Sequence, residues 1–254
     1  MGKIIAVVNQ KGGVGKTTSA VNLTAALTEA GKRVLLCDFD PQANATSGLG
    51  LDKRRLKYSV YDVVINDEPA ANAIVKTKYG DVLPSTADLA GAGVELVTLP
   101  EPNYRLRNAL ESVRDQYDII FIDCPPSLEL LTVNALVAAD SVLIPMQCEY
   151  YALEGIADLM TSIKMCNKNL NRRLEVEGIV LTMYDARANL TNQVANELRK
   201  FLGDKVYETV VPRSIRLSEA PSHGIPGVAY DKFNKGSRAY LALAEEFISK
   251  NKEA

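Results

Sequence analysis

The stretch NQKGGVGKTTSAVNL, residues 9–23, contains the residue types that hold phosphate groups. Glycines let the backbone curl so that successive N–H groups point inward, and a following helix adds the positive end of its dipole. In such a loop a lysine reaches the β- and γ-phosphates, and the hydroxyl that follows it ligates Mg²⁺. Lys16 and Thr17 occupy these two positions. The residues of this stretch predicted to contact a bound nucleotide are Lys11, Gly12, Gly13, Val14, Gly15, Lys16, Thr17 and Thr18.

The loop departs from the common spacing GxxxxGK[ST], because Gln10 stands where that pattern has its first glycine. It also carries a second lysine, Lys11, beside the glycine pair. The alternative is a glycine-rich turn with solvated lysines, but the strand-like segment before the loop and the helical pattern after it favour a phosphate-binding loop. From the residues alone, Lys11 is either a ligand contact or a surface lysine without a partner.

Three aspartates stand where predicted strands end. Asp123 closes the apolar run in YDIIFIDCPP, and a carboxylate at that position can hold Mg²⁺ and its waters. Asp38 and Asp40 emerge where another apolar run gives way to a polar loop. We predict that Asp40 orients the attacking water and that Asp38 lies near the metal, because phosphoryl transfer depends on positioning and charge neutralisation. Either residue could instead cap a helix or occupy a solvated turn.

The strands and helices that position these residues can be predicted from the sequence pattern. Short apolar runs alternate with longer amphipathic ones, which is typical of a parallel sheet covered by helices. Strands are predicted at residues 3–8, 33–37, 118–122, 141–145, 176–182 and 206–211, and helices at 17–29, 104–114, 128–138, 152–167, 190–201 and 237–250. A pair of extended pieces near residues 73–83 is expected at a sheet edge. The prediction is an α/β fold in three layers, with a mostly parallel twisted sheet and helices on both faces, in a single domain over residues 1–254.

Composition excludes several classes of protein. Apolar residues make up 47% and charged residues 24% of the 254 residues, and the net charge of −2 is ordinary for a soluble globular protein. We find neither a membrane-length apolar run nor a signal peptide, so a cytoplasmic location is expected. His223 is the only histidine, which excludes histidine triads and multi-histidine metal sites. The four cysteines form no CxxC pair and are expected to be reduced and buried.

Several segments together resemble the ParA/Soj family of chromosome-partitioning ATPases, which have a deviant Walker A loop. The match runs from Lys3 to about Phe247. The segments are KGGVGKTT, DFDPQ, FIDCPPSL, QCEYYALEG, RLSEAPSHGIP and the later YD and KGSRAY. The KGGxGKTT loop alone is shared with MinD proteins, nitrogenase iron proteins and iron–sulfur scaffold ATPases. EYYALEG and LSEAPSHG are more particular to the partitioning branch. The resemblance implies a P-loop ATPase that uses ATP and Mg²⁺.

The resemblance also implies roles for individual residues. In this family the lysine that matches Lys11 crosses a dimer interface and contacts the nucleotide of the other subunit, so Lys11 is predicted to be catalytic together with Lys16 and Asp40. Pro212 and Ser214 are predicted to line the base, and Met183 either joins them or has a structural role. Arginines that match Arg187 and Arg216 bind DNA without sequence preference in relatives, although either could be an ordinary surface arginine here.

Residues 199–238 contain eight Lys/Arg against four Asp/Glu, a net charge of +4 that suits binding to a phosphate backbone. The partners that the resemblance implies are a second copy of the chain in the presence of ATP, non-specific double-stranded DNA of the nucleoid, and a ParB-type centromere-binding protein. The phosphate loop begins too early for a helix-turn-helix before it, and the final LAEEFISKNKEA lacks a basic amphipathic face, so no membrane binding is expected.

Three alternatives stay open at this point. One is a MinD-like, membrane-cycling regulator of cell division. Another is an iron–sulfur carrier, which would need paired cysteines at a dimer axis, a setting that Cys124 and Cys148 lack. The last is a nucleotide-binding regulator with negligible turnover.

Overall fold

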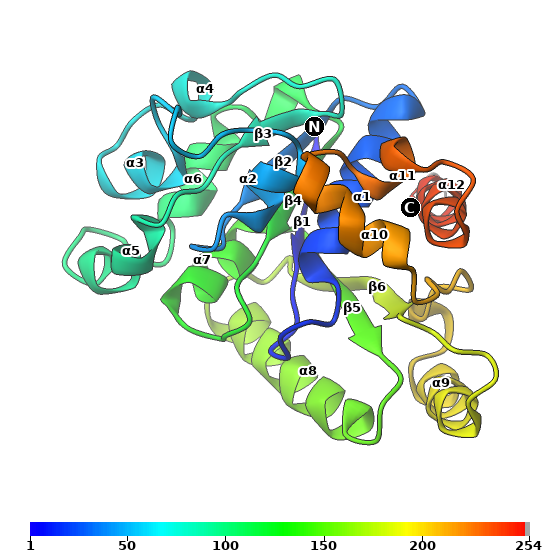
Figure 1. Cartoon of the computed structure of the whole chain (residues 1–254). Helices are drawn as coiled ribbons and strands as arrows, with labels where there is room; N and C mark the ends of the chain where they lie inside the picture. Colours follow the sequence, from blue (N-terminus) through cyan, green and yellow to red (C-terminus); the bar gives the residue numbers. More distant parts are fainter. Residues whose placement is uncertain (252–254) are drawn as a thin grey trace.

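The computed structural model describes residues 1–251, so residues 252–254, the end of the predicted domain and of the LAEEFISKNKEA segment, lie outside the described residues. One six-stranded sheet runs through the molecule in the order β3-β2-β4-β1-β5-β6 (Figure 1). Every pairing within this sheet is parallel. The strands are β1 Lys3–Val7, β2 Val34–Asp38, β3 Asp81–Leu83, β4 Ile119–Asp123, β5 Ser141–Gln147 and β6 Glu175–Thr182.

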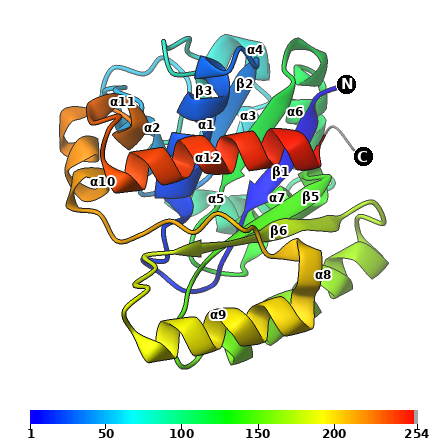
Figure 2. The same cartoon turned by 90° about the vertical axis from the view of Figure 1, so that its right-hand side faces the viewer.

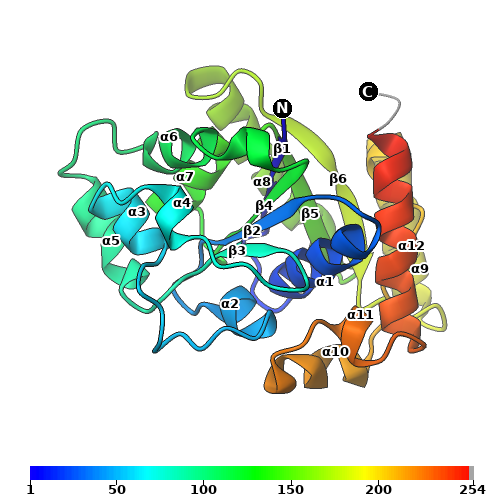
Figure 3. The same cartoon turned by 90° about the horizontal axis from the view of Figure 1, so that it is seen from above.

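Helices cover both faces of the sheet, because the strands are apolar on both sides. In β1, Ile4 and Ala6 pack into one apolar cluster, and Ile5 and Val7 into the other. Figures 2 and 3 show α1 and α12 on one face and α7 and α8 on the other. The α-helices are α1 Lys16–Glu29, α2 Asn44–Gly48, α3 Val60–Ile65, α4 Ala70–Ala73, α5 Leu89–Leu96, α6 Arg105–Glu111, α7 Leu130–Ala138, α8 Ala152–Asn169, α9 Asn189–Leu202, α10 Ile215–Glu219, α11 Gly227–Tyr230 and α12 Lys235–Lys250. The predicted three-layer α/β fold is confirmed.

The strand predicted at residues 206–211 is wrong. This segment runs beside β6 with one isolated bridge, between Val206 and Ile179, and with hydrogen bonds from the N–H groups of Tyr207 and Val211 to the carbonyl oxygens of Ile179 and Leu181. The backbone N–H groups of Glu208 and Thr209 donate instead to the two carboxylate oxygens of Glu246, each at 2.9 Å. The step from Tyr207 to Val211 spans four residues where β6 has two, so the residues between them bulge out of a regular ladder and Glu246 holds their N–H groups.

The edge element expected near residues 73–83 is present as β3, the outer strand next to β2. Helices α2, α3, α4, α5, α10 and α11 were not predicted. Each has between four and eight residues, which is too short for helical periodicity to stand out in the sequence. Within residues 1–251, no helix combines the length and apolar character needed to cross a bilayer.

Candidate nucleotide site

The loop between β1 and α1 has the backbone shape that a phosphate requires. Gly13 and Gly15 have positive φ angles of 73° and 90°, a region that residues with a Cβ rarely adopt. Helix α1 begins at Lys16, so its unpaired N–H groups and the positive end of its dipole belong to the loop. Gly12 has open space where a Cβ would stand, so packing within the single chain does not explain this glycine.

Side chains at the ends of two neighbouring strands brace the loop. Gln147, the last residue of β5, donates from Nε2 to the carbonyl oxygen of Gly13 at 3.0 Å. The hydroxyl of Thr182, the last residue of β6, donates to the carbonyl oxygen of Val14 at 2.7 Å. Sequence reasoning missed both residues. The available signal was a polar residue at the carboxyl end of a predicted strand, where ligand-facing groups gather in parallel sheets.

Lys16 is buried with little to satisfy its charge. Its side chain is 6% exposed, and Nζ donates to the backbone carbonyl of Lys11 at 3.2 Å. Burial lowers the pKa of Lys16, while the nearby Asp123 carboxylate is the largest influence that raises it. An ammonium group has three donors, so this lysine retains donor capacity that a phosphate oxygen would satisfy.

Asp123 has the surroundings expected of a residue that binds a cation. Its Cα is the register partner of the Asp38 Cα on the neighbouring strand, and its side chain is fully buried. Neither carboxylate oxygen of Asp123 has a hydrogen-bond partner among residues 1–251. Burial raises its pKa and the charge of Asp38 raises it further, whereas the neighbouring Thr17 hydroxyl lowers it. An unpartnered buried carboxylate is costly, so Asp123 with Thr17 fits a site for hydrated Mg²⁺.

Asp38 is differently placed. Its Oδ2 accepts from both the N–H and the hydroxyl of Thr46 at 2.7 Å, and its Oδ1 accepts from the N–H of Asp40 at 3.3 Å. Burial raises the pKa of Asp38 to about 6, although the bonds from Thr46 act in the opposite direction. Asp38 therefore fastens α2 to the end of β2, and its contact with a metal stays a prediction.

Asp40 lies in the same cluster, because its charge contributes to the raised pKa of both Asp38 and Asp123. It is 7% exposed, and its Oδ1 accepts from the N–H of Gln42 at 2.9 Å. Within the described part of the chain, no group of three or more His, Cys, Asp or Glu side chains could hold a metal ion by itself. Phosphate oxygens and water would therefore supply most of the ligands, which is the usual case for Mg²⁺.

Lys11 contrasts with Lys16. Its side chain is 55% exposed, and its Nζ forms an ion pair with Glu149 of the same chain. An exposed ion pair of this kind is weak and is compatible both with a surface lysine and with a lysine that contacts a ligand. Glu149 belongs to the EYYALEG segment, which served only as a family marker in the sequence. Contact between Lys11 and the nucleotide of a second subunit stays a prediction.

A cavity of about 130 Å³ adjoins the loop and fits the predicted base-binding residues. Gly15 and Thr18 line one part of it, and Met183, Pro212 and Ser214 line another. Met183 has a φ of +49°, which is uncommon for a residue with a long side chain and is often found at functional sites. The structure thus brings together the residues that the sequence placed around the base.

The two predicted DNA-contacting arginines, Arg187 and Arg216, line one groove of about 1290 Å³. The other charged residues of its lining are Arg213, Lys235, Arg238, Asp185 and Glu219. Arg187 pairs with Asp185 at 3.1 Å and Arg216 pairs with Glu219 at 2.9 Å. Sequence reasoning counted the three additional cations in the basic segment but gave them no role. Exposed pairs of this kind are weak, so a polyanion can displace the carboxylates.

All four cysteines are buried and free, as expected from their spacing. Burial raises the pKa of the Cys124 thiol well above its usual value, and it raises the pKa of Cys148 to about 11. Neither thiol has the lowered pKa and exposure of a ligand that reaches a shared cluster.

Three features define a P-loop nucleotide-binding protein. They are a glycine-rich loop between a parallel strand and a helix, a buried lysine at the start of that helix, and an aspartate without a hydrogen-bond partner on a neighbouring strand. A family model described as an AAA domain matches residues 2–176. The sporulation initiation inhibitor protein Soj of Bacillus subtilis is 56% identical over 248 residues, which cover 97% of this chain and 98% of that protein. The chromosome partitioning protein ParA of Caulobacter vibrioides is 50% identical over 255 residues, 99% and 96% of the two chains. The chain belongs to the MinD/ParA family, alongside the Soj and ParA chromosome-partitioning proteins.

A solved structure shares the fold of this chain. Cobyrinic acid a,c-diamide synthase of Mycobacterium smegmatis, with bound ADP and magnesium, has a TM-score of 0.84 and 36% sequence identity to this chain. The match covers 96% of this chain and 93% of that one.

Proposed function

We propose that this protein is an ATP-operated switch for chromosome or plasmid partitioning. ATP and Mg²⁺ bind at the phosphate loop, two copies associate, the dimer binds DNA, and hydrolysis to ADP and phosphate dissolves it. A ParB-type centromere-binding partner accelerates hydrolysis, and the protein works on the nucleoid in the cytoplasm. The name of the relative at 50% identity, a chromosome partitioning protein, supports the partitioning role. The observation that carries the nucleotide site is the unpartnered Asp123 carboxylate beside Lys16 and Thr17.

ATP would neutralise the buried charges that the single chain leaves unsatisfied. Lys16 would bind the β- and γ-phosphates, and Thr17 and Asp123 would hold Mg²⁺ and its waters. The metal supplies charge neutralisation for the phosphates. Pro212 and Ser214 would line the base in the adjoining cavity. ADP and magnesium in the similar solved structure support this choice of ligand.

Asp40 would orient the attacking water, and Lys11 from the second subunit would neutralise charge on the transferred phosphoryl group. In the single chain Lys11 is held by one exposed carboxylate, a contact that is worth at most about 1 kcal/mol. A triphosphate carries more negative charge in a site with less water, so Lys11 exchanges Glu149 for the partner's nucleotide at a net gain. This exchange makes hydrolysis depend on dimerisation.

DNA binding follows from duplication of the groove. One copy offers five cations against two carboxylates, and a dimer presents two such grooves to one duplex. Doubling the number of phosphate contacts raises affinity steeply at a given salt concentration. The groove is lined by arginine and lysine without a recognition helix for the major groove, so the affinity is expected to be independent of sequence.

The test is cosedimentation with random-sequence DNA in the presence of ATP and Mg²⁺. Arg187→Glu with Arg216→Glu should weaken binding to all sequences alike and lower the slope of affinity against salt. The matched control is Arg172→Glu with Arg173→Glu, which makes the same charge change at exposed residues before β6 that do not line the groove.

If the control variant loses as much DNA binding as the groove variant, the net charge of the protein and not the groove determines DNA binding, and the groove is not the binding site. A loss confined to one DNA sequence would contradict backbone binding. ATP-dependent cosedimentation with lipid vesicles, in place of DNA, would instead support a MinD-like membrane role.

A further inference from the structure

The groove that contains the two predicted DNA-contacting arginines also has an apolar component, which phosphate binding does not use. Ile215, the first residue of α10, lines this groove and is 76% exposed. A single exposed aliphatic side chain is ordinary on a protein surface, but this one lies among positive charges, where it gains nothing from a phosphate. We name the groove the basic groove and define it by Arg187, Arg213, Ile215, Arg216, Lys235 and Arg238.

Local packing holds Ile215 in its exposed position. Ser214 before it and Leu217 after it are each 8% exposed, and the hydroxyl of Ser214 donates to Oδ1 of Asn234 at 2.6 Å. Helix α12 lies close against both residues, because a Cβ on Gly236 would stand only 2.8 Å from Cβ of Ser214 and 2.6 Å from Cδ1 of Leu217. These two residues occupy the buried side of the short helix, so Ile215 is presented to solvent on a fixed support.

The positive charge around Ile215 is carried mainly by arginine. Four of the five cations of the basic groove are arginines, and the fifth is Lys235. A guanidinium is planar and less strongly hydrated than an ammonium, so it contacts apolar surfaces as well as phosphates. Proteins that enter the minor groove of DNA use arginine in this way and often add an apolar residue such as isoleucine. The composition of the basic groove therefore fits the minor groove better than it fits a row of phosphates alone.

We propose that Ile215 enters the minor groove of duplex DNA and packs against its deoxyribose walls, while the arginines beside it bind the flanking phosphates. The minor groove of B-DNA is about 6 Å wide, which is enough for one aliphatic side chain. Its walls are sugars in every sequence, whereas the major groove offers only the thymine methyl group as an apolar contact. The contact of Ile215 is therefore independent of sequence. The inference deepens the proposed DNA binding and rests on it.

Salt dependence separates this contact from the ionic ones. The slope of affinity against salt reports the number of phosphates that cations neutralise, and Ile215 carries no charge. Ile215→Ala should therefore lower the affinity for DNA at every salt concentration without changing the slope, in contrast to Arg187→Glu with Arg216→Glu. A linear polyphosphate has phosphates but no sugars, so it should bind equally well to Ile215→Ala and to the wild type.

The experiment is fluorescence anisotropy of a labelled random-sequence duplex, with Mg²⁺ and a non-hydrolysable ATP analogue, over a series of salt concentrations. Ile215→Ala should bind about fivefold more weakly than the wild type, because the outer carbon atoms of the side chain no longer contact the sugars. Ile215→Val, which keeps most of the apolar contact, should bind nearly as the wild type does. On an A·T-rich duplex, netropsin, which occupies the minor groove, should displace the wild type, whereas methyl green, which occupies the major groove, should not.

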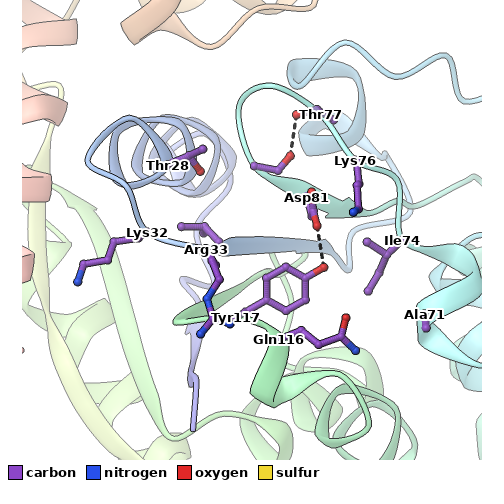
Figure 4. A pocket seen from close by; sticks show the side chains of 12 residues that line it. Thr28, Lys32, Arg33, Ala71, Ile74, Lys76, Thr77, Asp81, Gln116 and Tyr117 are labelled. Carbon is purple, nitrogen blue, oxygen red and sulfur yellow. Dashed lines mark hydrogen bonds between the residues drawn. The ribbon is translucent and has the colours of Figure 1, made fainter.

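The matched control is Ile74→Ala, the same chemical change in a different part of the molecule. Figure 4 shows Ile74 in a pocket of about 380 Å³ that Ala71 and Tyr117 also line. This pocket adjoins β3 at one edge of the sheet, whereas the basic groove lies beyond the end of β6 at the other edge. Ile74→Ala should bind DNA as the wild type does, and circular dichroism should show that each variant is folded.

The outcomes separate this inference from the proposed function. A wild type that does not bind duplex DNA with the ATP analogue would contradict both. DNA binding that is unchanged in Ile215→Ala, or that netropsin does not affect, would overturn the inference alone. An equal loss of polyphosphate binding in Ile215→Ala, or an equal loss of DNA binding in Ile74→Ala, would overturn it as well, because contact with the sugars would then not be the cause of the loss.

Discussion

Asp123→Asn should stabilise the nucleotide-free protein while it impairs binding of Mg²⁺ and nucleotide. In the wild type, the carboxylate is fully buried and neither oxygen has a hydrogen-bond partner among residues 1–251. Asp38 and Asp40 add like charge, and the neighbouring Thr17 hydroxyl and Lys16 ammonium offset only part of the resulting rise in the pKa of Asp123. The asparagine side chain has nearly the same shape but no charge. It also brings an N–H₂ group that can donate to the neighbouring carboxylates.

The size of the effect follows from the cost of a buried polar group without partners, which is about 1–3 kcal/mol and more when the group is charged. We therefore expect the free energy of unfolding to rise by about 2 kcal/mol near neutral pH. For a chain of this length, that corresponds to an increase in Tm of about 4–8 °C. The gain should vanish or reverse when MgADP is added, because the wild type is stabilised by a ligand that the variant binds poorly.

The pH dependence gives a second readout. Burial raises the folded-state pKa of Asp123 above its ordinary value of 3.8, so between these two values the folded state binds more protons than the unfolded state. The stability contributed by this group is therefore lost as pH rises. The difference in unfolding free energy between variant and wild type should be small near pH 4 and should grow toward pH 8.

The assay is urea denaturation of both proteins at pH 5, 6.5 and 8, with and without MgADP. Asp123→Glu serves as the control that keeps the charge but changes the position of the oxygens. If nucleotide-free Asp123→Asn were less stable than the wild type at pH 8, the Asp123 carboxylate would have a partner in the free protein. The interpretation that the Asp123 carboxylate is without a partner until it binds a metal would then be wrong.

Two further predictions concern the loop. Gln147→Ala removes the hydrogen bond to the Gly13 carbonyl and should weaken MgADP binding about tenfold in calorimetry, the worth of one well-placed hydrogen bond. Gln193→Ala, an exposed change on α9, is the control, and unchanged affinity in Gln147→Ala would mean that the loop holds its shape alone. Glu149→Gln removes the carboxylate that pairs with Lys11 in the single chain and should strengthen ATP-dependent dimerisation up to about fivefold in sedimentation equilibrium. Weaker dimerisation would show that Glu149 positions Lys11 in the dimer instead of competing for it.

The sequence was sufficient for features that local patterns control. The phosphate loop, its flanking strand and helix, and the aspartates at the strand ends are each specified within a short stretch, and parallel pairing then brings the strand ends to one edge. The three-layer architecture followed from the alternation of apolar and amphipathic runs. Pro212 and Ser214 came from resemblance, since their approach to the loop depends on how the chain returns to the sheet.

The features that were missed depend on contacts between distant residues. Lys11 and Glu149 are separated by 138 positions, and Gln147 braces a carbonyl 134 positions away. The strand predicted at residues 206–211 failed because its bonds to β6 are four residues apart on one side and two on the other, and Glu246, on α12, holds N–H groups of the residues between them. A local pattern contains no information about such partners, and a polar residue at the end of a strand could equally face solvent.

The central claim is that Lys11 joins hydrolysis to the association of two copies. Sedimentation velocity with ADP, ATP and a non-hydrolysable ATP analogue, on the wild type and on Lys11→Ala, tests it most directly. The wild type should be a monomer with ADP and a dimer with the analogue, whereas Lys11→Ala should bind nucleotide but remain a monomer that does not hydrolyse ATP. A Lys11→Ala protein that dimerises and hydrolyses ATP like the wild type would contradict the account.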